Sequence, residues 1–171
     1  MKINNTEQQS IVIIKSDIAM QIFGEILANL CTEFKLTKCI IYLEGELGAG
    51  KTTLVRGFLR GFNYDKNVKS PTYTIVEPYC LNATYIYHFD LYRLANPEEL
   101  EYIGIRDYLE QNAIFLFEWA SHGKGFLPIP DLICQIDILD SNTRKITLKF
   151  TNSLSNKILP RIFEETQKHG I

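Results

Sequence analysis

No sign of charge prevails in this sequence. Its 18 Lys and Arg residues nearly balance 20 Asp and Glu residues, which leaves a formal net charge of -2 at pH 7. The field around such a chain does not attract polyanions, whereas a dedicated nucleic-acid-binding module is usually far more basic. The composition therefore argues against direct nucleic-acid binding as the main task of the protein.

Cysteines are few and scattered. The four cysteines, Cys31, Cys39, Cys80 and Cys134, form no C-x-x-C pair, and no histidines flank them at the spacing of metal ligands. This pattern excludes the common zinc motifs and a disulfide framework. We expect reduced thiols in a cytosolic protein.

Signals for export and for membrane insertion are lacking as well. Residues 1–7 do not begin a basic region followed by the apolar run of a signal peptide. No apolar stretch approaches the roughly 18 residues that a membrane span requires. We therefore expect a soluble, cytoplasmic protein that does not bind a membrane.

The sequence also lacks internal repeats, low-complexity tracts and linkers long enough to separate domains. A chain of 171 residues with 46% apolar and 12% aromatic residues can bury a sizeable core, which excludes wholesale disorder. We expect one globular domain over residues 1–171.

Hydrophobic spacing predicts strands and helices in mostly alternating order, which favours an α/β fold. After Ser16, a candidate N-cap, a 3.6-residue period predicts a helix. Its expected apolar face is Ile18, Ile22, Ile26, Leu27 and Leu30. Further helices are expected at 51–60, ended by Gly61, from Asn96 to about 111, and in a short C-terminal segment broken near Pro160.

The strand candidates are short β-branched and aromatic runs bounded by turn residues. Two pairs of them, 73–79 with 84–89 and 132–139 with 145–150, predict antiparallel hairpins. Residues 62–72 are polar, without periodicity, and predict a functional loop. The remaining strands are expected at 11–14, 39–43 and 113–117.

The segment from Gly45 to Thr52 matches the phosphate-loop pattern G-x-x-x-x-G-K-S/T and lies between an expected strand and an expected helix. Its glycines let the backbone curl around a polyanion, so that N–H groups and the positive helix N-terminus point at phosphate oxygens. Lys51 is then expected to reach the β and γ phosphates. The alternative is a glycine-rich turn with a surface lysine. The expected nucleotide contacts in this loop are Glu46, Leu47, Gly48, Ala49, Gly50, Lys51, Thr52 and Thr53.

A phosphate loop implies Mg²⁺, which prefers oxygen ligands. Thr52 would supply a hydroxyl and Glu118, at the end of the strand 113–117, a carboxylate. Asp90 closes the strand 84–89 and would hold a metal-bound water or orient the water that attacks the γ-phosphate. The alternatives are an exposed acid for Glu118 and a turn cap for Asp90.

Hydroxyl side chains follow the polar loop at the distance where P-loop GTPases place a switch that senses the γ-phosphate. Thr72 is the first candidate sensor, with Ser70 and Thr74 as alternatives and a plain strand entry as the simpler interpretation. Trp119, directly after Glu118, is expected to line the site, unless it is a core residue. His88 fits a packed core residue better than an acid or base.

Residues 46–57 resemble the phosphate loop of the bacterial TsaE (YjeE) family of P-loop ATPases. Residues 68–79 resemble the switch segment of that family, residues 88–94 resemble its central acidic motif, and Glu118-Trp119 falls at its metal-side glutamate. The resemblance extends from about residue 40 to 120. It fades in the C-terminal tail, to which no functional residue is therefore transferred.

The resemblance implies a fold, a function and partners. The fold is a three-layer P-loop NTPase-like core with a mixed parallel and antiparallel sheet and flanking helices. The function is that of an Mg²⁺-dependent ATPase subunit needed to install threonylcarbamoyl on the tRNA adenosine beside the anticodon. In the family this subunit docks on the TsaB–TsaD heterodimer, so tRNA is met only indirectly, which suits an acidic chain.

No arginine lies in the phosphate loop, and a missing arginine finger typically costs ~10³ to 10⁵ in rate. We therefore expect slow hydrolysis by the chain alone, with partner docking reordering residues 62–74 or bringing Arg93 or a partner cation to the γ-phosphate.

Three other function classes carry a P-loop. A small-molecule kinase would need an arginine-rich lid, but residues 119–130 hold only Lys124 as a cation. A GTPase would need an N/T-K-x-D motif, and Thr37-Lys38-Cys39-Ile40 lacks its aspartate. A nucleotide-gated binding module without hydrolysis stays open as an alternative.

Overall fold

The computed structural model describes residues 9–171. The expectation that residues 1–7 carry no export signal lies outside the described residues. No helix in the described range is both long and apolar enough to cross a bilayer. The elements are β1 (Gln9–Ile14), α1 (Asp17–Glu33), β2 (Cys39–Glu44), α2 (Lys51–Arg60), β3 (Val76–Leu81), β4 (Thr84–Asp90), α3 (Glu99–Tyr102), α4 (Ile105–Leu109), β5 (Ala113–Glu118), the 3₁₀ turn η1 (Ala120–Gly123), β6 (Leu132–Ile138), β7 (Arg144–Phe150) and α5 (Ser155–Lys168).

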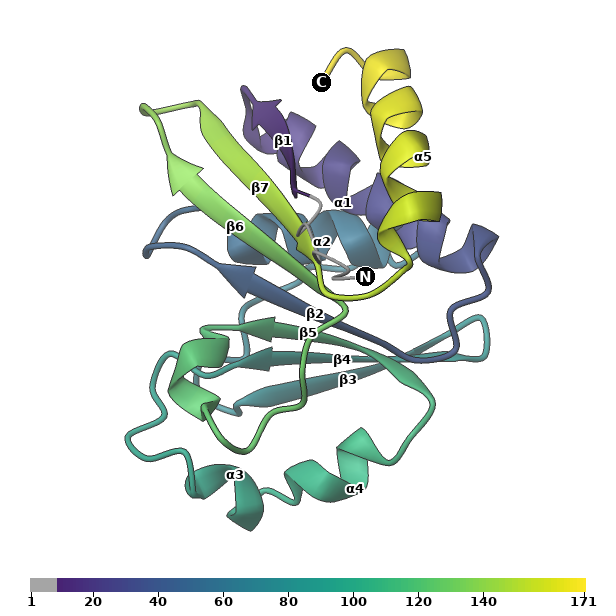
Figure 1. Ribbon diagram of the computed structural model, residues 1–171. Helices are drawn as coiled ribbons and strands as arrows, with labels where there is room; N and C mark the ends of the chain where they lie inside the picture. The colour runs from purple at the N-terminus through teal and green to yellow at the C-terminus, as the bar shows by residue number, and fades with distance from the viewer. Residues whose placement is uncertain (1–8) are drawn as a thin grey trace, which may run out of the picture.

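The strands form one 7-stranded sheet in the order β1-β7-β6-β2-β5-β4-β3 (Figure 1). β2 pairs in parallel with β5 and β6, and β4 pairs in parallel with β5. β3–β4, β6–β7 and β1–β7 are antiparallel. Antiparallel neighbours need only a tight turn, whereas parallel neighbours need a crossover. The predicted mixed sheet with two hairpins is confirmed.

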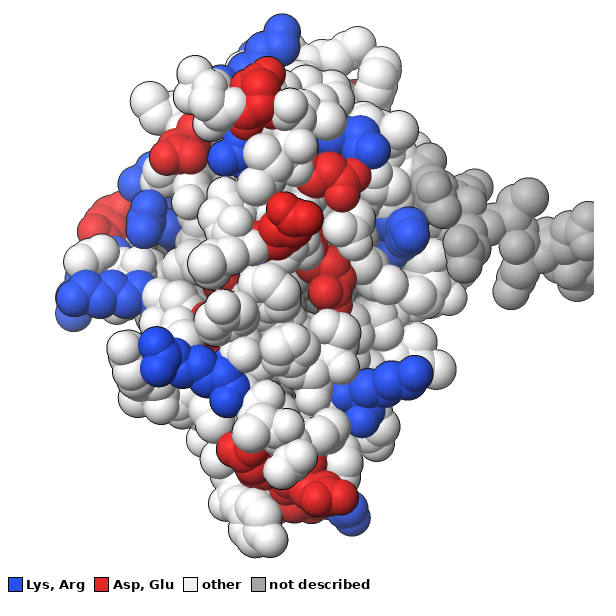
Figure 2. All heavy atoms as spheres, turned by 90° about the vertical axis from the view of Figure 1, so that its left-hand side faces the viewer, with Lys and Arg blue, Asp and Glu red and all other residues white. Residues whose placement is uncertain are grey.

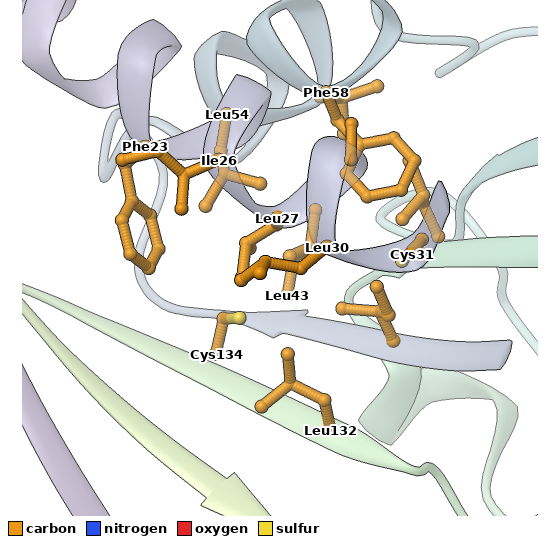
Figure 3. Packing of buried hydrophobic residues seen from close by; sticks show 14 of the residues in the cluster. Phe23, Ile26, Leu27, Leu30, Cys31, Leu43, Leu54, Phe58, Leu132 and Cys134 are labelled. Atoms are coloured by element: carbon orange, nitrogen blue, oxygen red, sulfur yellow. The ribbon is translucent and has the colours of Figure 1, made fainter. Parts of the chain in front are cut away.

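Helices cover both faces of this sheet, which gives the three expected layers. α1, α2 and α5 lie on one face, and α3 and α4 lie on the other (Figure 1). Burial of each large apolar side chain contributes roughly 1.5–3 kcal/mol, so the packing between α1, α2 and the sheet is a main source of stability. The side chains that meet there include Phe23, Leu27, Leu30, Leu43, Leu54, Phe58, Leu132 and Cys134 (Figure 3).

α1 and α2 approach each other closely because glycines lie where they cross. A Cβ atom added at Gly57 of α2 would meet the backbone oxygen of Gln21 at 2.0 Å. One added at Gly24 of α1 would meet the backbone oxygen of Leu54 at 2.3 Å. This close contact fixes α2, and with it the loop before α2, relative to the sheet.

The expected start of α1 is confirmed, but its expected apolar face is partly wrong. The backbone N–H of Ala19 donates to Ser16 Oγ at 3.0 Å, which is the predicted N-cap. Ile18 is 71% exposed, because the buried face of α1 follows Met20, Phe23 and Leu27 instead. Ile18 lines the cavity described below.

Three other expected elements have different bounds. Residues 73–75 are not strand, because Ile75 has a φ of 67° and closes a turn on Pro71, so β3 begins at Val76. The helical region after Asn96 is split into α3 and α4 by Gly104, whose φ is 73°. α5 runs through Pro160 without a break, because Ile158 and Ile162 on either side are buried in the core and compensate for one lost backbone hydrogen bond.

β2, β4, β5 and β6 end at one edge of the sheet, on the left of Figure 1. Figure 2 looks onto this end of the molecule. Basic and acidic side chains are interspersed on it, and acidic ones gather at its lower end over α3 and α4. The carboxyl edge of parallel strands is where α/β folds place their ligands.

Candidate functional site

The predicted phosphate loop lies between β2 and α2, as expected. Gly50, directly before α2, has a φ of 105°, a backbone conformation that strongly favours glycine. No side chain of residues 9–171 caps the N-terminus of α2. The free N–H groups of its first turn are therefore available to an anion.

Lys51 lies in the first turn of α2 and folds back over its own loop. Its Nζ donates to the carbonyl oxygens of Gly45 at 2.8 Å and Glu46 at 2.9 Å. The amine also lies 4.1 Å from the centre of the Trp119 ring, a cation–π distance. Burial lowers the pKa of Lys51, and the carboxylates of Glu118 and Asp90 oppose that shift. A bound anion would therefore replace the carbonyl oxygens of Gly45 and Glu46 as the hydrogen-bond acceptor of this amine.

Glu118 and Thr52 are brought together. Thr52 Oγ1 donates to Glu118 Oε1 at 2.9 Å, although 66 residues separate them in the chain. Glu118 is only 3% exposed. One hydroxyl and one carboxylate fit Mg²⁺, which prefers oxygen ligands and usually takes one or two from the protein, with phosphates and waters completing the shell. The described residues contain no cluster of three His, Cys, Asp or Glu that could hold a metal alone.

Asp90 lies opposite Glu118 in the pairing of β4 with β5. Its Oδ2 accepts hydrogen bonds from the hydroxyls of both Ser70 and Thr72, the latter at 2.9 Å, and its Oδ1 accepts one from the backbone N–H of Tyr92 at 3.0 Å. Two of the three candidate sensors, Ser70 and Thr72, thus donate to the same carboxylate. Thr74 makes no hydrogen bond to it.

The buried side chain of His88 also contacts the site, through Glu118. The sequence did not predict this contact. Its Nε2 lies 2.8 Å from Glu118 Oε1. His88 and Asp90 are two residues apart on β4, so their side chains lie on the same face of the sheet. That spacing was the available signal for this contact.

Aromatic and basic side chains form the rim of the site. Trp119 adopts a φ of 59° directly after β5, and its ring packs against Tyr92 at 5.0 Å between centroids. The Arg93 guanidinium lies 4.3 Å from the centre of the Tyr73 ring and donates to the Tyr73 hydroxyl at 3.2 Å. Arg93 is therefore held beside the loop that carries Ser70 and Thr72.

One open cavity of about 970 Å³ joins these groups. That volume is at the upper end of the range for small-molecule sites, ~300–1,000 Å³. The residues predicted for the site line it, except Glu46, which is exposed, and Ala49, which is buried in the core. Lining residues without a predicted role in the site are Lys15, Ser16, Asp17, Ile18, Tyr92, Ser141, Asn142 and Arg144.

Arg144, at the start of β7, is the largest omission from the sequence-based site. Its Nε donates to the carbonyl of Ala49 at 3.2 Å and its Nη2 to that of Gly48 at 3.4 Å. Its Nη1 donates to Asp140 at 2.8 Å and to Thr143 at 3.1 Å, in the turn between β6 and β7. Arg144 therefore joins this turn to the outer side of the phosphate loop. The sequence predicted the turn but carried no motif that connects it to the loop.

Comparison with known proteins places the chain in a family. The family model for threonylcarbamoyl adenosine biosynthesis protein TsaE matches residues 14–146. The tRNA threonylcarbamoyladenosine biosynthesis protein TsaE of Haemophilus influenzae is 51% identical over 137 residues, 80% of this chain and 84% of that protein. The Bacillus subtilis protein of the same name is 36% identical over 71% of this chain and 75% of its own length.

A solved structure supports the fold. The crystal structure of Bacillus subtilis YdiB superposes with a TM-score of 0.76, covering 94% of this chain and 98% of that one, at 24% identity. At that identity the match establishes the three-layer P-loop NTPase-like fold and nothing finer. The extent of the family match, together with a phosphate loop in the expected place, shows that this chain belongs to the TsaE family.

Proposed function

We propose that this protein binds ATP with Mg²⁺ and hydrolyses it, as a subunit that docks on a TsaB–TsaD heterodimer during threonylcarbamoyladenosine synthesis on tRNA. The observation that carries the proposal is the convergence of Lys51, Thr52, Asp90 and Glu118 on one cavity at the carboxyl edge of the sheet. Family membership implies nucleotide binding; the choice of ATP, the metal and the partners are our inference.

The phosphates occupy the end of the cavity at the N-terminus of α2. Lys51 Nζ exchanges the carbonyls of Gly45 and Glu46 for phosphate oxygens, and free N–H groups of the loop bind the remaining charge. Thr52 and Glu118 hold Mg²⁺, which supplies charge neutralisation on the phosphate oxygens. The main task of the protein is thus positioning and electrostatic stabilisation.

Asp90 orients the attacking water. The water oxygen bonds to the γ phosphorus while the bond between that phosphorus and the β–γ bridging oxygen breaks, which yields ADP, phosphate and a proton. The hydroxyls of Thr72 and Ser70 donate hydrogen bonds to Asp90. When ATP binds, they would donate to the γ-phosphate instead. The segment 62–74 would then differ between nucleotide states.

The rest of the cavity lining offers a site for the nucleoside. The first turn of α1, with the exposed Ile18, and the β6–β7 turn, with Ser141 and Asn142, also line the cavity. An exposed apolar side chain suits the face of a base, and short polar side chains suit its edge. We assign the adenosine moiety to these residues.

The chain alone is expected to hydrolyse ATP slowly, because no arginine lies in the phosphate loop. Arg93 lines the cavity but is engaged with Tyr73. A partner that moves residues 62–74 would also move Tyr73 and free Arg93, or would supply a cation of its own. The mixed charge of the face in Figure 2 supports an indirect role with tRNA, carried by the partners in the cytoplasm.

Phosphate release tests this proposal. We expect the wild type to release phosphate slowly from ATP, only with Mg²⁺, and faster than from GTP. Lys51→Ala should abolish release and weaken ATP binding, whereas Lys157→Ala, a lysine exposed on α5, should change neither. Transfer of phosphate to an added metabolite would point to a kinase, and ATP binding without any turnover would point to a nucleotide-gated binding module.

A further inference from the structure

The imidazole of His88 is completely buried and makes one polar contact. Its exposed fraction is 0%, and it lies on β4 between the aromatic residues Tyr87 and Phe89. Nε2 meets Glu118 Oε1 at 2.8 Å, whereas Nδ1 is the buried side-chain atom without a hydrogen-bond partner in the described part of the chain. A half-satisfied imidazole is a costly way to fill a core. Packing alone does not account for histidine at this position.

The single contact of His88 goes to the carboxylate that faces the nucleotide cavity. An ionised carboxylate can only accept hydrogen bonds, so Nε2 carries the proton. Oε1 of Glu118 then receives two donors, His88 from inside the sheet and Thr52 from α2. Its Oε2 accepts no hydrogen bond from any described residue, and Glu118 lines the cavity.

The two donors differ in what happens when metal and nucleotide bind. The Thr52 hydroxyl is itself a candidate metal ligand and leaves Glu118 when it turns to the metal. His88 is confined in the core and cannot turn away. It is therefore the donor that keeps Glu118 in one orientation in both states.

We propose that His88 is a positioning residue for the magnesium site: its Nε2–H fixes the Glu118 carboxylate so that an oxygen faces the metal. This inference rests on the proposed function, because it assumes that Glu118 serves Mg²⁺. Hydrogen-bond donors behind a metal ligand commonly contribute ~10–100-fold in metal affinity. Loss of the donor should therefore weaken the metal site without weakening the contacts of the phosphate loop with nucleotide.

Two substitutions distinguish the loss of the hydrogen-bond donor of His88 from a change in the volume of its side chain. His88→Phe keeps a ring of similar size without a donor, and His88→Gln keeps an N–H at about the reach of Nε2. The readout is binding without turnover: fluorescence of Trp119, the one tryptophan in the sequence, during ATP titrations at fixed Mg²⁺ and with excess chelator. Direct binding of Mn²⁺ to the ATP complex gives a second readout.

We expect His88→Phe to need ~10–100-fold more Mg²⁺ for half-saturation while its metal-free ATP affinity stays within about twofold of the wild type. His88→Gln should recover most of that loss. An unchanged Mg²⁺ requirement in His88→Phe, a parallel loss of metal-free affinity, or no recovery in His88→Gln would overturn the proposal.

Two controls keep the outcomes separate. If His88→Phe does not fold, His88→Met, which has a flexible apolar side chain, replaces it in the comparison with His88→Gln. If the wild type itself shows no Mg²⁺-dependent ATP binding, the proposed function fails. A metal-dependent wild type with an unaffected His88→Phe overturns only the role of His88.

Discussion

The hydroxyl of Thr52 lies 2.9 Å from the carboxylate oxygen of Glu118, and this contact joins the first turn of α2 to the end of β5. Neither residue is close to the other in sequence. The parallel pairing of β2 with β5 brings the two together, because it places the end of β5 beside the loop that leaves β2. The proposed metal-binding half of the site thus depends on the order of the strands in the sheet.

Removal of the Thr52 hydroxyl tests that half of the site. Thr52→Val keeps the shape of the side chain but cannot bind Mg²⁺, so we expect Mg²⁺-dependent phosphate release to fall by roughly 100-fold or more. Thr52→Ser keeps the hydroxyl and should retain most of the activity. Equal loss in both variants would contradict a ligand role for the hydroxyl.

Arg144 should affect nucleotide affinity more than turnover. It fixes the outer carbonyls of the phosphate loop at Gly48 and Ala49, so Arg144→Ala leaves the loop to be ordered when nucleotide binds. We expect ATP affinity to fall by roughly tenfold, measured by calorimetry. Lys145→Ala removes a charge that pairs with Asp137 at 2.9 Å on the same hairpin and should leave affinity unchanged. The same loss of affinity in both variants would show that net charge is responsible, and not the hydrogen bonds of Arg144 to the phosphate loop.

Gly57→Ala should destabilise the protein although alanine favours helices. The added methyl would meet the Gln21 backbone oxygen at 2.0 Å, so α1 and α2 must separate. We expect the free energy of unfolding in urea to fall by about 1–3 kcal/mol. Asn29→Ala, at an exposed position of α1, should leave it unchanged or slightly raised. A Gly57→Ala variant as stable as the wild type would show that the helices do not pack this closely.

Tyr79 predicts a loss of stability at alkaline pH. Burial, with smaller effects of Glu77 and Tyr64, raises the pKa of its phenol from 10.0 to about 12. Between these values the folded chain keeps a proton that the unfolded chain has lost, so the free energy of unfolding falls as pH rises through this window. At about 1.4 kcal/mol for each pKa unit, the effect is at most about 3 kcal/mol.

Tyr79→Phe removes this proton and should make the fall in stability between pH 10 and 12 less steep, as measured by urea unfolding at several pH values. The variant and the wild type should have the same slope below pH 9. An unchanged alkaline slope in Tyr79→Phe would assign the loss to other groups.

The sequence predicts those features of the fold and site that depend on local patterns. A few consecutive residues are enough to predict the phosphate loop, the N-cap at Ser16 and the short buried strand that ends at Glu118. Their mutual placement follows from the parallel strand order. For that reason, most of the residues expected in the site do line one cavity.

What the sequence did not predict depends on contacts between distant segments. Arg144 reaches Ala49 across 95 positions, and nothing near either residue indicates the contact. Ile18 fits a helical period, but the orientation of α1 on the sheet decides which residues of that period are buried. The local chemistry of Pro160 predicts a break in the C-terminal helix. The burial of Ile158 and Ile162 keeps α5 continuous.

The most direct test of the account is phosphate release from ATP with Mg²⁺, with and without a purified TsaB–TsaD pair, with Lys51→Ala as the blank. We predict slow release by the chain alone, a clear rise with the pair, and no release by Lys51→Ala in either condition. A rate that does not respond to the pair, or release that survives in Lys51→Ala, would contradict the account of a partner-dependent ATPase built on this phosphate loop.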